Sequence, residues 1–373
     1  MVKICHVTSA HPKEDVRIFQ KECTSLARAG YDVYLVQQGE CYEKNGVHLV
    51  GFGAVASNRI KRMLQTSRIA YQKALEVDAD VYHLHDPELL TYALKLKRKG
   101  KKVIFDSHEF YAEQIKHKAY IPRPFRGIVA KLYAFRQNWI LNRIDGLIFP
   151  CFVNGKNPFE GQRCRMVLIN NVPLLEELYN HYDPMVTKWE NTVCHIGSLT
   201  HNRGITHLVK AAEPANCTVC LGGKFESAEY EAQLRALPEF SRVNHLGQLD
   251  RHQVLEALQK TPVGIATLLN VGQYSQLGNL PTKVYEYMAL AIPSVLSDTP
   301  YNRQVVEQYG FGICVDPADT EAIAKAIRYL LDNPEEAKKM GENGRRAIKE
   351  EFNWSVEEKK LFALYENITG GTV

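Results

Sequence analysis

Residues 281–293 combine a helix start with two charged side chains, and they carry the clearest chemical signal in the sequence. They read Pro-Thr-Lys-Val-Tyr-Glu-Tyr-Met-Ala-Leu-Ala-Ile-Pro. Proline suits the first turn of a helix, and the free N–H groups of that turn attract anions. Lys283 would lie beside such an anion, with Glu286 one turn deeper at the i+3 position. A diphosphate at the helix start and a sugar diol at Glu286 would suit a nucleotide-sugar, although an amphipathic helix with a surface Lys-Glu pair fits the spacing equally well.

Polar loops follow several short apolar runs, which we interpret as strands of parallel sheets. In such sheets, ligands bind beyond the carboxyl ends of the strands. The first loop carries His11, Asp15 and Arg17, where Asp15 can cap the next helix and Arg17 could be a surface residue. The second, at residues 83–88, carries His85 and Asp86. Its His-x-His spacing also occurs in metal sites, but we favour a polar wall of an active site over a metal site or a packed strand end.

Two further loops carry candidate residues of the same kind. The apolar run 103–106 delivers His108 and Glu109 to its carboxyl end, and a histidine there can hold a sugar hydroxyl as charge develops. The loop at residues 195–204 contains Gly197 and Ser198, where glycine allows a ligand close to the backbone. Arg203 can neutralise a diphosphate through two parallel hydrogen bonds. A lone histidine is more often structural, but its place at a strand end favours a functional role.

The pattern Pro-x-Lys-x-x-Glu-Tyr-Met-Ala-x-x-x-Pro resembles the donor-site helix of retaining GT-B glycosyltransferases of family 4. The segment His-x-His-Asp-Pro at 83–87 and Asp-x-His at 106–108 extend this resemblance over nearly the whole chain. The resemblance implies an α/β protein with two doubly wound Rossmann-like domains that face a cleft. It also implies metal-independent, retaining transfer of a sugar from a UDP- or GDP-linked donor, without a cofactor. The acceptor would be a cell-envelope glycan or a lipid-linked molecule.

The resemblance also assigns roles to individual residues. It implies that His108 contacts the transferred sugar and that Glu286 binds the donor ribose, and we regard these two as the catalytic pair. The donor-binding residues would be Gly197, Ser198, Arg203, Gly278, Asn279, Leu280, Thr282, Lys283 and Glu286. The acceptor side would comprise His11, Asp15, Arg17, His85, Asp86 and Glu109, and no residue is assigned to a metal.

The chain departs from the family pattern at three positions. Many relatives have a Gly-Gly pair in the first loop, which is absent here, and Ser198 stands where relatives often have arginine. The family commonly has two glutamates eight residues apart in the donor site, and the first of these positions is Gly278. We expect Lys283 to replace the missing cation and backbone N–H groups of residues 278–280 to replace the missing glutamate.

Alternating apolar runs and helical patterns define the elements that position these residues. They predict a first domain over residues 1–172, a linker over 173–190 and a second domain over 191–352. The last helical pattern covers 354–369 within a segment at 353–373, and the resemblance implies that this helix crosses back to the first domain. We expect strands at 3–8, 31–37, 47–52, 81–85, 102–106, 146–150, 166–169, 192–196, 218–221, 243–246, 263–267, 294–296 and 312–315.

Composition limits the compartment and the partners. The chain has 373 residues, 45% hydrophobic and 24% charged, and contains no apolar run long enough to span a bilayer, so we expect a cytoplasmic enzyme. Residues 1–172 contain 27 Lys and Arg against 16 Asp and Glu, whereas the rest contains 19 against 26. The basic first half, with cations and aromatic residues at 116–136 and a second basic helix from Arg59, predicts peripheral contact with an anionic membrane.

The nine cysteines are scattered along the sequence, and we expect all of them to be buried thiols.

Two other functions remain as alternatives. The missing first glutamate would suit a non-catalytic protein that binds nucleotide-sugars or polysaccharides. The segment 51–56, Gly-x-Gly-x-x-Ala, matches the dinucleotide fingerprint and would suit an NAD(P)-dependent oxidoreductase, although it follows the third strand rather than the first. Nucleic-acid binding is not expected, because no recognisable nucleic-acid-binding module accompanies the basic residues.

Overall fold

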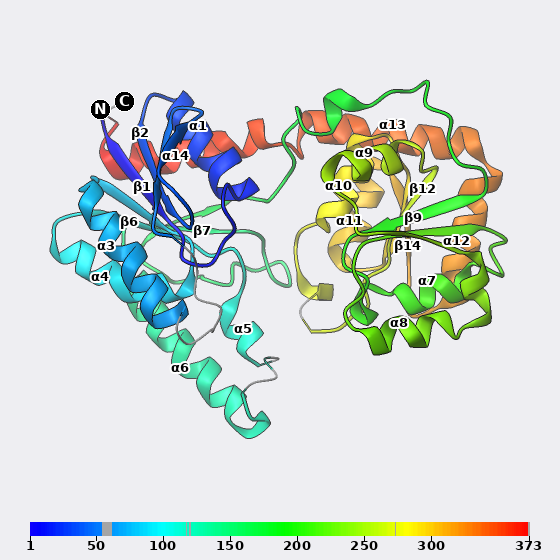
Figure 1. Ribbon diagram of the computed structural model, residues 1–373, viewed down its shortest axis with the longest axis horizontal. Coiled ribbons are helices and arrows are strands. Elements are labelled where there is room, and N and C mark those ends of the chain that lie inside the picture. Colours follow the sequence, from blue (N-terminus) through cyan, green and yellow to red (C-terminus); the bar gives the residue numbers. More distant parts are fainter. Residues whose placement is uncertain (54–61, 117, 119–120, 273, 372–373) are drawn as a thin grey trace. The chain divides into compact units, whose positions relative to one another are not determined.

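The computed structural model describes residues 1–53, 62–116, 118, 121–272 and 274–371, which form two compact units (Figure 1). The first unit comprises Met1–Phe152, Lys156–Asn171 and Ser355–Val373, and the second comprises Val153–Gly155 and Val172–Trp354. Each unit has its own sheet.

The first unit is built on a sheet that has eight strands among the described residues. Its strands follow the order β3-β4-β2-β1-β5-β6-β7-β8, and every neighbouring pair is parallel except the hairpin of β3 and β4. The buried apolar runs form the central strands, as expected for a parallel sheet covered on both faces. The strands are β1 Lys3–Val7, β2 Asp32–Gln37, β3 Tyr42–Lys44, β4 Val47–Gly51, β5 Val81–Leu84, β6 Lys102–Asp106, β7 Gly146–Phe149 and β8 Arg165–Leu168.

Helices cover this first sheet, and the last of them comes from the end of the sequence. Helix α14 contacts β7 closely, because a Cβ on Gly146 would lie 2.9 Å from Ile368 Cδ1. Figure 1 shows α14 in red beside the blue strands. The helices are a π-helix at Val16–Cys23, α1 Thr24–Arg28, a π-helix at Arg62–Thr66, α3 Ser67–Val77, a 3-10 turn at Pro87–Leu89, α4 Leu90–Arg98, α5 Tyr111–Ile115, α6 Arg123–Leu141 and α14 Trp354–Thr369.

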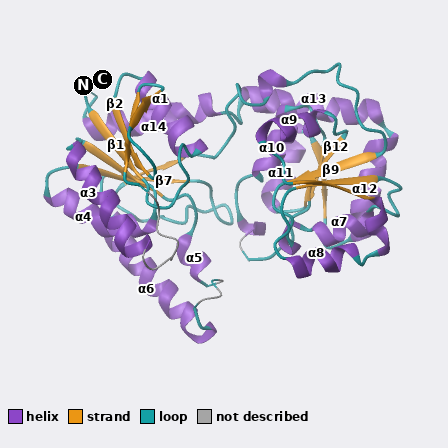
Figure 2. Cartoon of the chain, viewed as in Figure 1, coloured by secondary structure: helices purple, strands orange, loops and turns teal. Residues whose placement is uncertain are grey.

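The second unit contains a sheet that has six strands among the described residues, all parallel, in the order β11-β10-β9-β12-β13-β14. Helices lie on both sides of the strands (Figure 2). One buried apolar cluster joins the sheet to α7, α8 and α12, and a second joins it to α10, α11 and α13. The strands are β9 Thr192–Ile196, β10 Thr218–Gly222, β11 Val243–Gly247, β12 Val263–Ala266, β13 Ser294–Ser297 and β14 Gly312–Val315.

The helices of the second unit alternate with its strands, except that α13 follows α12 directly. The α-helices are α7 Ile205–Ala211, α8 Ala228–Arg235, α9 Arg251–Gln259, α10 Thr282–Ala289, α11 Pro300–Tyr309, α12 Thr320–Asp332 and α13 Pro334–Glu350. The 3-10 turns are Tyr179–His181, His201–Arg203, Pro238–Arg242 and Tyr274–Gln276.

The predicted α/β class with two parallel sheets is confirmed, whereas some details of the sequence interpretation are wrong. The helix expected from Asp15 begins as a π-helix, and β3 was not expected. Cys41 is exposed and Cys314 is half-buried, so these two do not fit the prediction of nine buried thiols. Residues 54–56 of the dinucleotide-like segment and Arg59 at the start of the second basic helix lie outside the described residues.

Candidate active site

The loop after β9 brings two stretches of backbone unusually close together. Gly197 has φ +139°, and its N–H donates to the Gly222 carbonyl over 2.8 Å. A Cβ on Gly223 would lie 1.9 Å from the Gly197 carbonyl oxygen, so this approach requires glycine. A Cβ on Gly197 would lie 3.3 Å from Lys283 Nζ, which places the lysine ammonium directly against this backbone.

Lys283 and His195 form a buried polar pair beside Gly197. Lys283 is 7% exposed, and its Nζ lies 2.5 Å from Nε2 of His195, a fully buried residue of β9. His195 Nδ1 lies 3.1 Å from the Ile265 carbonyl and donates to it, which leaves Nε2 as an acceptor for the lysine. Burial, together with the charge of Arg203, lowers the pKa of Lys283 to about 7. An anion beside Lys283 would therefore hold the amine in its charged form.

Arg203 is the second cation at this place. It ends the 3-10 turn at His201–Arg203, where its N–H donates to Thr200 Oγ1 over 3.2 Å. Gly204 follows with φ +75°, and a Cβ there would lie 1.9 Å from the Thr267 carbonyl oxygen. Within the described part of the chain, the guanidinium of Arg203 has neither a hydrogen bond nor an ion pair, so it is available to a ligand.

Glu286 lies one turn inside α10 and is held by a residue that the sequence analysis missed. Its Oε1 accepts from Arg251 Nη1 over 2.7 Å, and its side chain is 18% exposed. Arg251 begins α9, which Asp250 and Gln253 start as a capping box. The capping box was visible in the sequence as a helix start, but the pairing of Arg251 with Glu286 was not.

The other predicted donor-site residues surround the start of α10 or the loop after β9. Pro281 is the N-cap of α10, and the exposed Thr282 opens its first turn. Gly278 and Asn279 are half-buried, and Leu280 is buried. Ser198 is exposed. These residues therefore lie on the elements to which the sequence assigned them.

In the first unit, the loops after the neighbouring strands β1 and β5 meet through His11 and Asp86. His11 Nδ1 lies 3.0 Å from Asp86 Oδ1, while the Thr8 hydroxyl and the Ser9 N–H donate to Asp86 Oδ2 over 2.8 and 2.6 Å. Burial opposes ionisation of Asp86, but these donors outweigh it and lower its pKa to about 2. Burial likewise lowers the pKa of His11, but the contact with Asp86 outweighs it, and the net pKa of His11 is raised.

His108 lies next to this pair, beyond the end of β6. Its ring centroid is 4.6 Å from that of His11, and its Nε2 lies 3.0 Å from His85 Nδ1 and 3.5 Å from Asp106 Oδ2. Burial lowers the pKa of His108 to about 3, despite the nearby charge of Asp106. His108 is therefore a neutral imidazole at neutral pH, suited to hydrogen bonding with a hydroxyl.

Three other predicted acceptor-side residues have different surroundings. Asp15 caps the helix at Val16–Cys23 by accepting from the N–H groups of its first turn. Arg17 differs from the expectation, because its guanidinium is buried in a paired contact with Asp106, at 3.1 Å for both hydrogen bonds, rather than lying on the surface or toward an acceptor. Glu109 is exposed and pairs with Gln114.

The dinucleotide-like segment has a structural explanation in its described part. A Cβ on Gly51 would lie 2.1 Å from the Gly39 carbonyl oxygen, so the glycine allows close packing of β4 against the preceding loop. Gly53 has φ +83° and forms a bridge with Gly39.

Solved structures and curated proteins of similar fold or sequence relate this chain to known proteins. A sucrose-phosphate synthase from Thermosynechococcus elongatus superposes with a TM-score of 0.77 at 17% identity over 100% of both chains. HepE from Anabaena, solved in complex with UDP-glucose, gives a TM-score of 0.67 at 13% identity over 98% of this chain and 100% of its own. Alpha-maltose-1-phosphate synthase from Mycolicibacterium smegmatis is 26% identical over 192 residues, which is 48% of each protein. The chain thus matches about half the length of that curated relative.

These likenesses define the fold as that of a GT-B glycosyltransferase. Residues 17–152 match the family described as Glycosyltransferase Family 4, and residues 185–347 match Glycosyl transferases group 1. The two models together match most of the chain, which therefore belongs to the GT-B glycosyltransferases described by them, as the resemblance predicted; the retaining mechanism stays a prediction. None of the helices formed by the described residues is both long and apolar enough to cross a membrane.

Proposed function

We propose that this glycosyltransferase moves a sugar from a nucleotide-sugar donor to a glycan or lipid-linked acceptor, with retention of configuration. The observation that carries the proposal is the pair of cations, Lys283 and Arg203, beside the glycine backbone after β9. One is buried with a lowered pKa, and the other has no partner among the described residues. An anionic ligand would relieve both conditions, because it restores the lysine charge and pairs the guanidinium.

The donor would bind the second unit through its diphosphate. Lys283, Arg203 and the N–H groups at the start of α10 would neutralise it, so this mechanism needs no catalytic metal. Glu286 would accept hydrogen bonds from the ribose through the oxygen that Arg251 does not hold. Backbone groups of residues 278–280 and Ser198 would contact the remainder of the donor. The UDP-glucose bound in the HepE structure supports a uridine-linked donor.

The reacting sugar and the acceptor would use residues of the first unit. The family resemblance supports His108 as the group that holds a hydroxyl of the transferred sugar. Its neutral imidazole can do so without placing a second positive charge near a cationic transition state. His11, Asp86 and Glu109 would line the acceptor side, whereas His85, predicted for the same side, is buried and would act there only through its contact with His108.

Binding and transfer can be tested separately. Calorimetry with UDP-glucose, GDP-mannose and ADP-glucose should find one donor that binds, and NMR of the product should show the anomeric configuration of the donor.

The role of Glu286 can be tested by substitution. Glu286→Ala should lower kcat/KM by a factor that corresponds to a loss of roughly 2–4 kcal/mol of transition-state stabilisation, while the protein stays folded. Glu256→Ala is the matched control, because Glu256 pairs with Lys260 over 2.7 Å elsewhere in the same unit. Binding without turnover would favour the non-catalytic alternative, and an inverted product would refute retention.

Helix α6 supports a membrane-bound acceptor. Its apolar side chains are unusually exposed, with Phe125 at 57%, Leu132 at 65% and Phe135 at 73%. They recur at three- and four-residue spacing with Ile128 and Trp139, so they share one face of the helix. Exposed cations, including Arg123 and Lys131, accompany this face. An anionic bilayer would attract the cations and cover the apolar face, as for an amphipathic helix at a membrane surface.

A further inference from the structure

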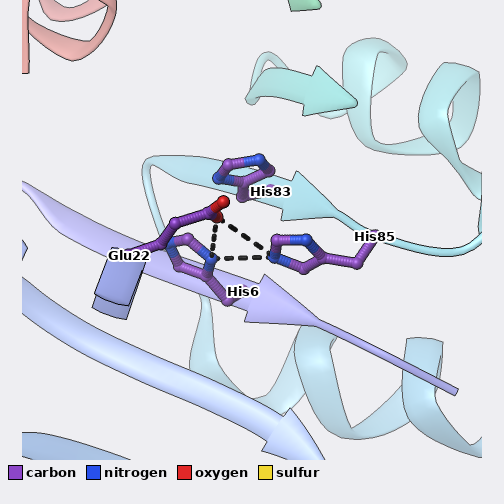
Figure 3. A group of neighbouring side chains, drawn as sticks. All are labelled: His6, Glu22, His83 and His85. Carbon is purple, nitrogen blue, oxygen red and sulfur yellow. Dashed lines mark hydrogen bonds and ion pairs between the residues drawn. The ribbon is translucent and has the colours of Figure 1, made fainter. Parts of the chain in front are cut away.

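Four side chains converge in the interior of the first unit, apart from the loops that carry the predicted donor contacts. They are His6 from β1, His83 from β5, His85 directly after β5, and Glu22 from the π-helix at Val16–Cys23 (Figure 3). Strand pairing places His6 directly beside His83. All four residues are at most 1% exposed, and one donor atom from each lies within 4.8 Å of the others.

Some of the nitrogen and oxygen atoms that face the centre of this cluster lack hydrogen-bond partners among the described residues. His6 Nδ1 and His85 Nε2 lie 2.9 Å apart, and Glu22 Oε2 lies 3.9 Å from the first and 4.0 Å from the second. Among the described residues, neither Glu22 Oε2 nor His83 Nε2 has a hydrogen-bond partner. Buried polar atoms without partners are costly, so these atoms point to something that binds between them.

The outward ring atoms are held in the manner typical of metal-binding histidines. The Tyr365 hydroxyl lies 2.8 Å from His83 Nδ1 and 3.2 Å from His6 Nε2. A phenolic oxygen can accept from both rings, and His85 Nδ1 can donate to His108 Nε2 over 3.0 Å. Each imidazole can therefore carry its proton on the outer nitrogen and leave the inner one free to bind a cation.

The surrounding charge also favours a cation. Two buried carboxyl groups, Glu22 and Asp106, face one buried guanidinium, Arg17, which lies 3.1 Å from each. A single guanidinium cannot compensate both groups when both are ionised, and a bound cation would supply the second positive charge.

We propose that His6, Glu22, His83 and His85 bind one divalent transition-metal ion, most suitably Zn²⁺. Three imidazoles and one carboxylate are ligands that zinc accepts in a tetrahedral site, where neighbouring donors are about 3.3 Å apart. The observed separations of 2.9, 3.9 and 4.0 Å bracket that spacing. All four positions would be filled by protein, so the ion would be structural and would bind no substrate.

The ion would act on the candidate active site only through His85. A metal on Nε2 of His85 fixes the proton on Nδ1, which then donates to His108 Nε2. His108 must in turn carry its own proton on Nδ1, so His85 becomes a positioning residue that sets the tautomer of the proposed sugar-binding histidine.

The first test measures metal in the intact protein, purified without a polyhistidine tag. Protein produced in zinc-supplemented medium should contain about one zinc per chain after gel filtration, and should release it only on unfolding because the site is buried. Protein produced with Co²⁺ should show the intense visible bands of tetrahedral cobalt. Less than about 0.1 metal per folded chain in both preparations would overturn the proposal.

The second test assigns the ligands. The double variant Glu22→Gln/His83→Gln should lose at least tenfold of the bound zinc, whereas His48→Gln, which changes an exposed histidine of the same sheet, should retain it. Equal zinc in the double variant and the wild type would overturn the assignment. If the double variant does not fold, the cobalt spectrum of the wild type still decides, since a spectrum that is not tetrahedral would contradict four protein ligands. Neither measurement depends on glycosyl transfer.

Discussion

Affinity for a nucleotide-sugar should fall as pH rises above neutrality, because Lys283 must be protonated to attract the diphosphate. The pKa of the free lysine is about 7 against an ordinary value of 10.5. A bound diphosphate favours the ammonium and raises this pKa, so binding takes up a proton. Binding should therefore weaken about fivefold between pH 7 and 8 and about tenfold, or about 1.4 kcal/mol, between pH 8 and 9.

The structure sets the upper limit and the window of this effect. If the ligand restored the ordinary pKa, the coupling free energy between protonation and binding would reach about 5 kcal/mol, and between pH 7 and 9 the dissociation constant should rise about 50-fold. The groups that face Lys283 are Arg203, His195, Glu286 and Cys194. Arginine remains charged throughout, burial lowers the pKa of His195 well below the window, and burial raises the pKa of Cys194 to about 12.

Calorimetry with the best-binding nucleotide-sugar in buffers of different ionisation enthalpy measures both the affinity and the proton uptake. Lys283→Arg should bind with a nearly constant affinity over the same range, because the guanidinium does not titrate there. Lys188→Met is the matched control. It removes another lysine of the second unit, whose pKa burial lowers to about 8, and should leave the profile unchanged. A wild-type dissociation constant that is constant from pH 7 to 9, without proton uptake, would refute the assignment of Lys283.

Three further predictions concern stability, chemistry and the membrane. Gly204→Ala should destabilise the second unit by about 3 kcal/mol in denaturant unfolding, because φ is +75° and the new Cβ would meet the Thr267 carbonyl, whereas Gly127→Ala, on open surface of α6, should be neutral or stabilising. His108→Ala should lower kcat more than it raises the KM for the donor, and an unchanged kcat would return His108 to a structural role. Co-sedimentation with liposomes should require anionic lipid, weaken with salt and fall when Leu132 and Phe135 become Ser; equal recovery with neutral liposomes would argue that α6 does not bind an anionic bilayer.

The alternation of elements was predictable because it depends on local patterns. The strand at 102–106 and the helix at 354–369 have the predicted bounds, since Gly, Pro and charged residues interrupt the apolar periodicity at their ends. The hairpin of β3 and β4 was missed, although Asn45-Gly46 is a strong hairpin signal and both residues have positive φ. The π-helix at Val16–Cys23 was not predictable, because its sequence fits an α-helix equally well.

Most predicted site residues lie at the strand ends or the helix start where the sequence placed them, but their partners could not be predicted. The pairing of Asp86 with His11 depends on β1 and β5 being neighbours in the sheet, although 73 residues and three strands lie between them in the sequence. Glu286 and Arg251 meet across α10 and α9 in the same way. The burial of Arg17 follows from Asp106, which lies 89 positions later in the chain. Such contacts depend on strand order and helix placement rather than on local sequence.

The use of α14 to complete the first unit has a consequence for biosynthesis. Tyr365 is fully buried against His6 and His83, yet it emerges from the ribosome only after the whole second unit has been made. At about 5–20 residues per second, the 183 residues between Asn171 and Ser355 delay this helix by roughly 10–40 s. During that time the nascent first unit exposes the apolar face of its sheet that α14 later covers. The second unit, whose residues are nearly continuous, can therefore finish folding first, and a premature stop before residue 355 would damage the unit at the opposite end of the sequence.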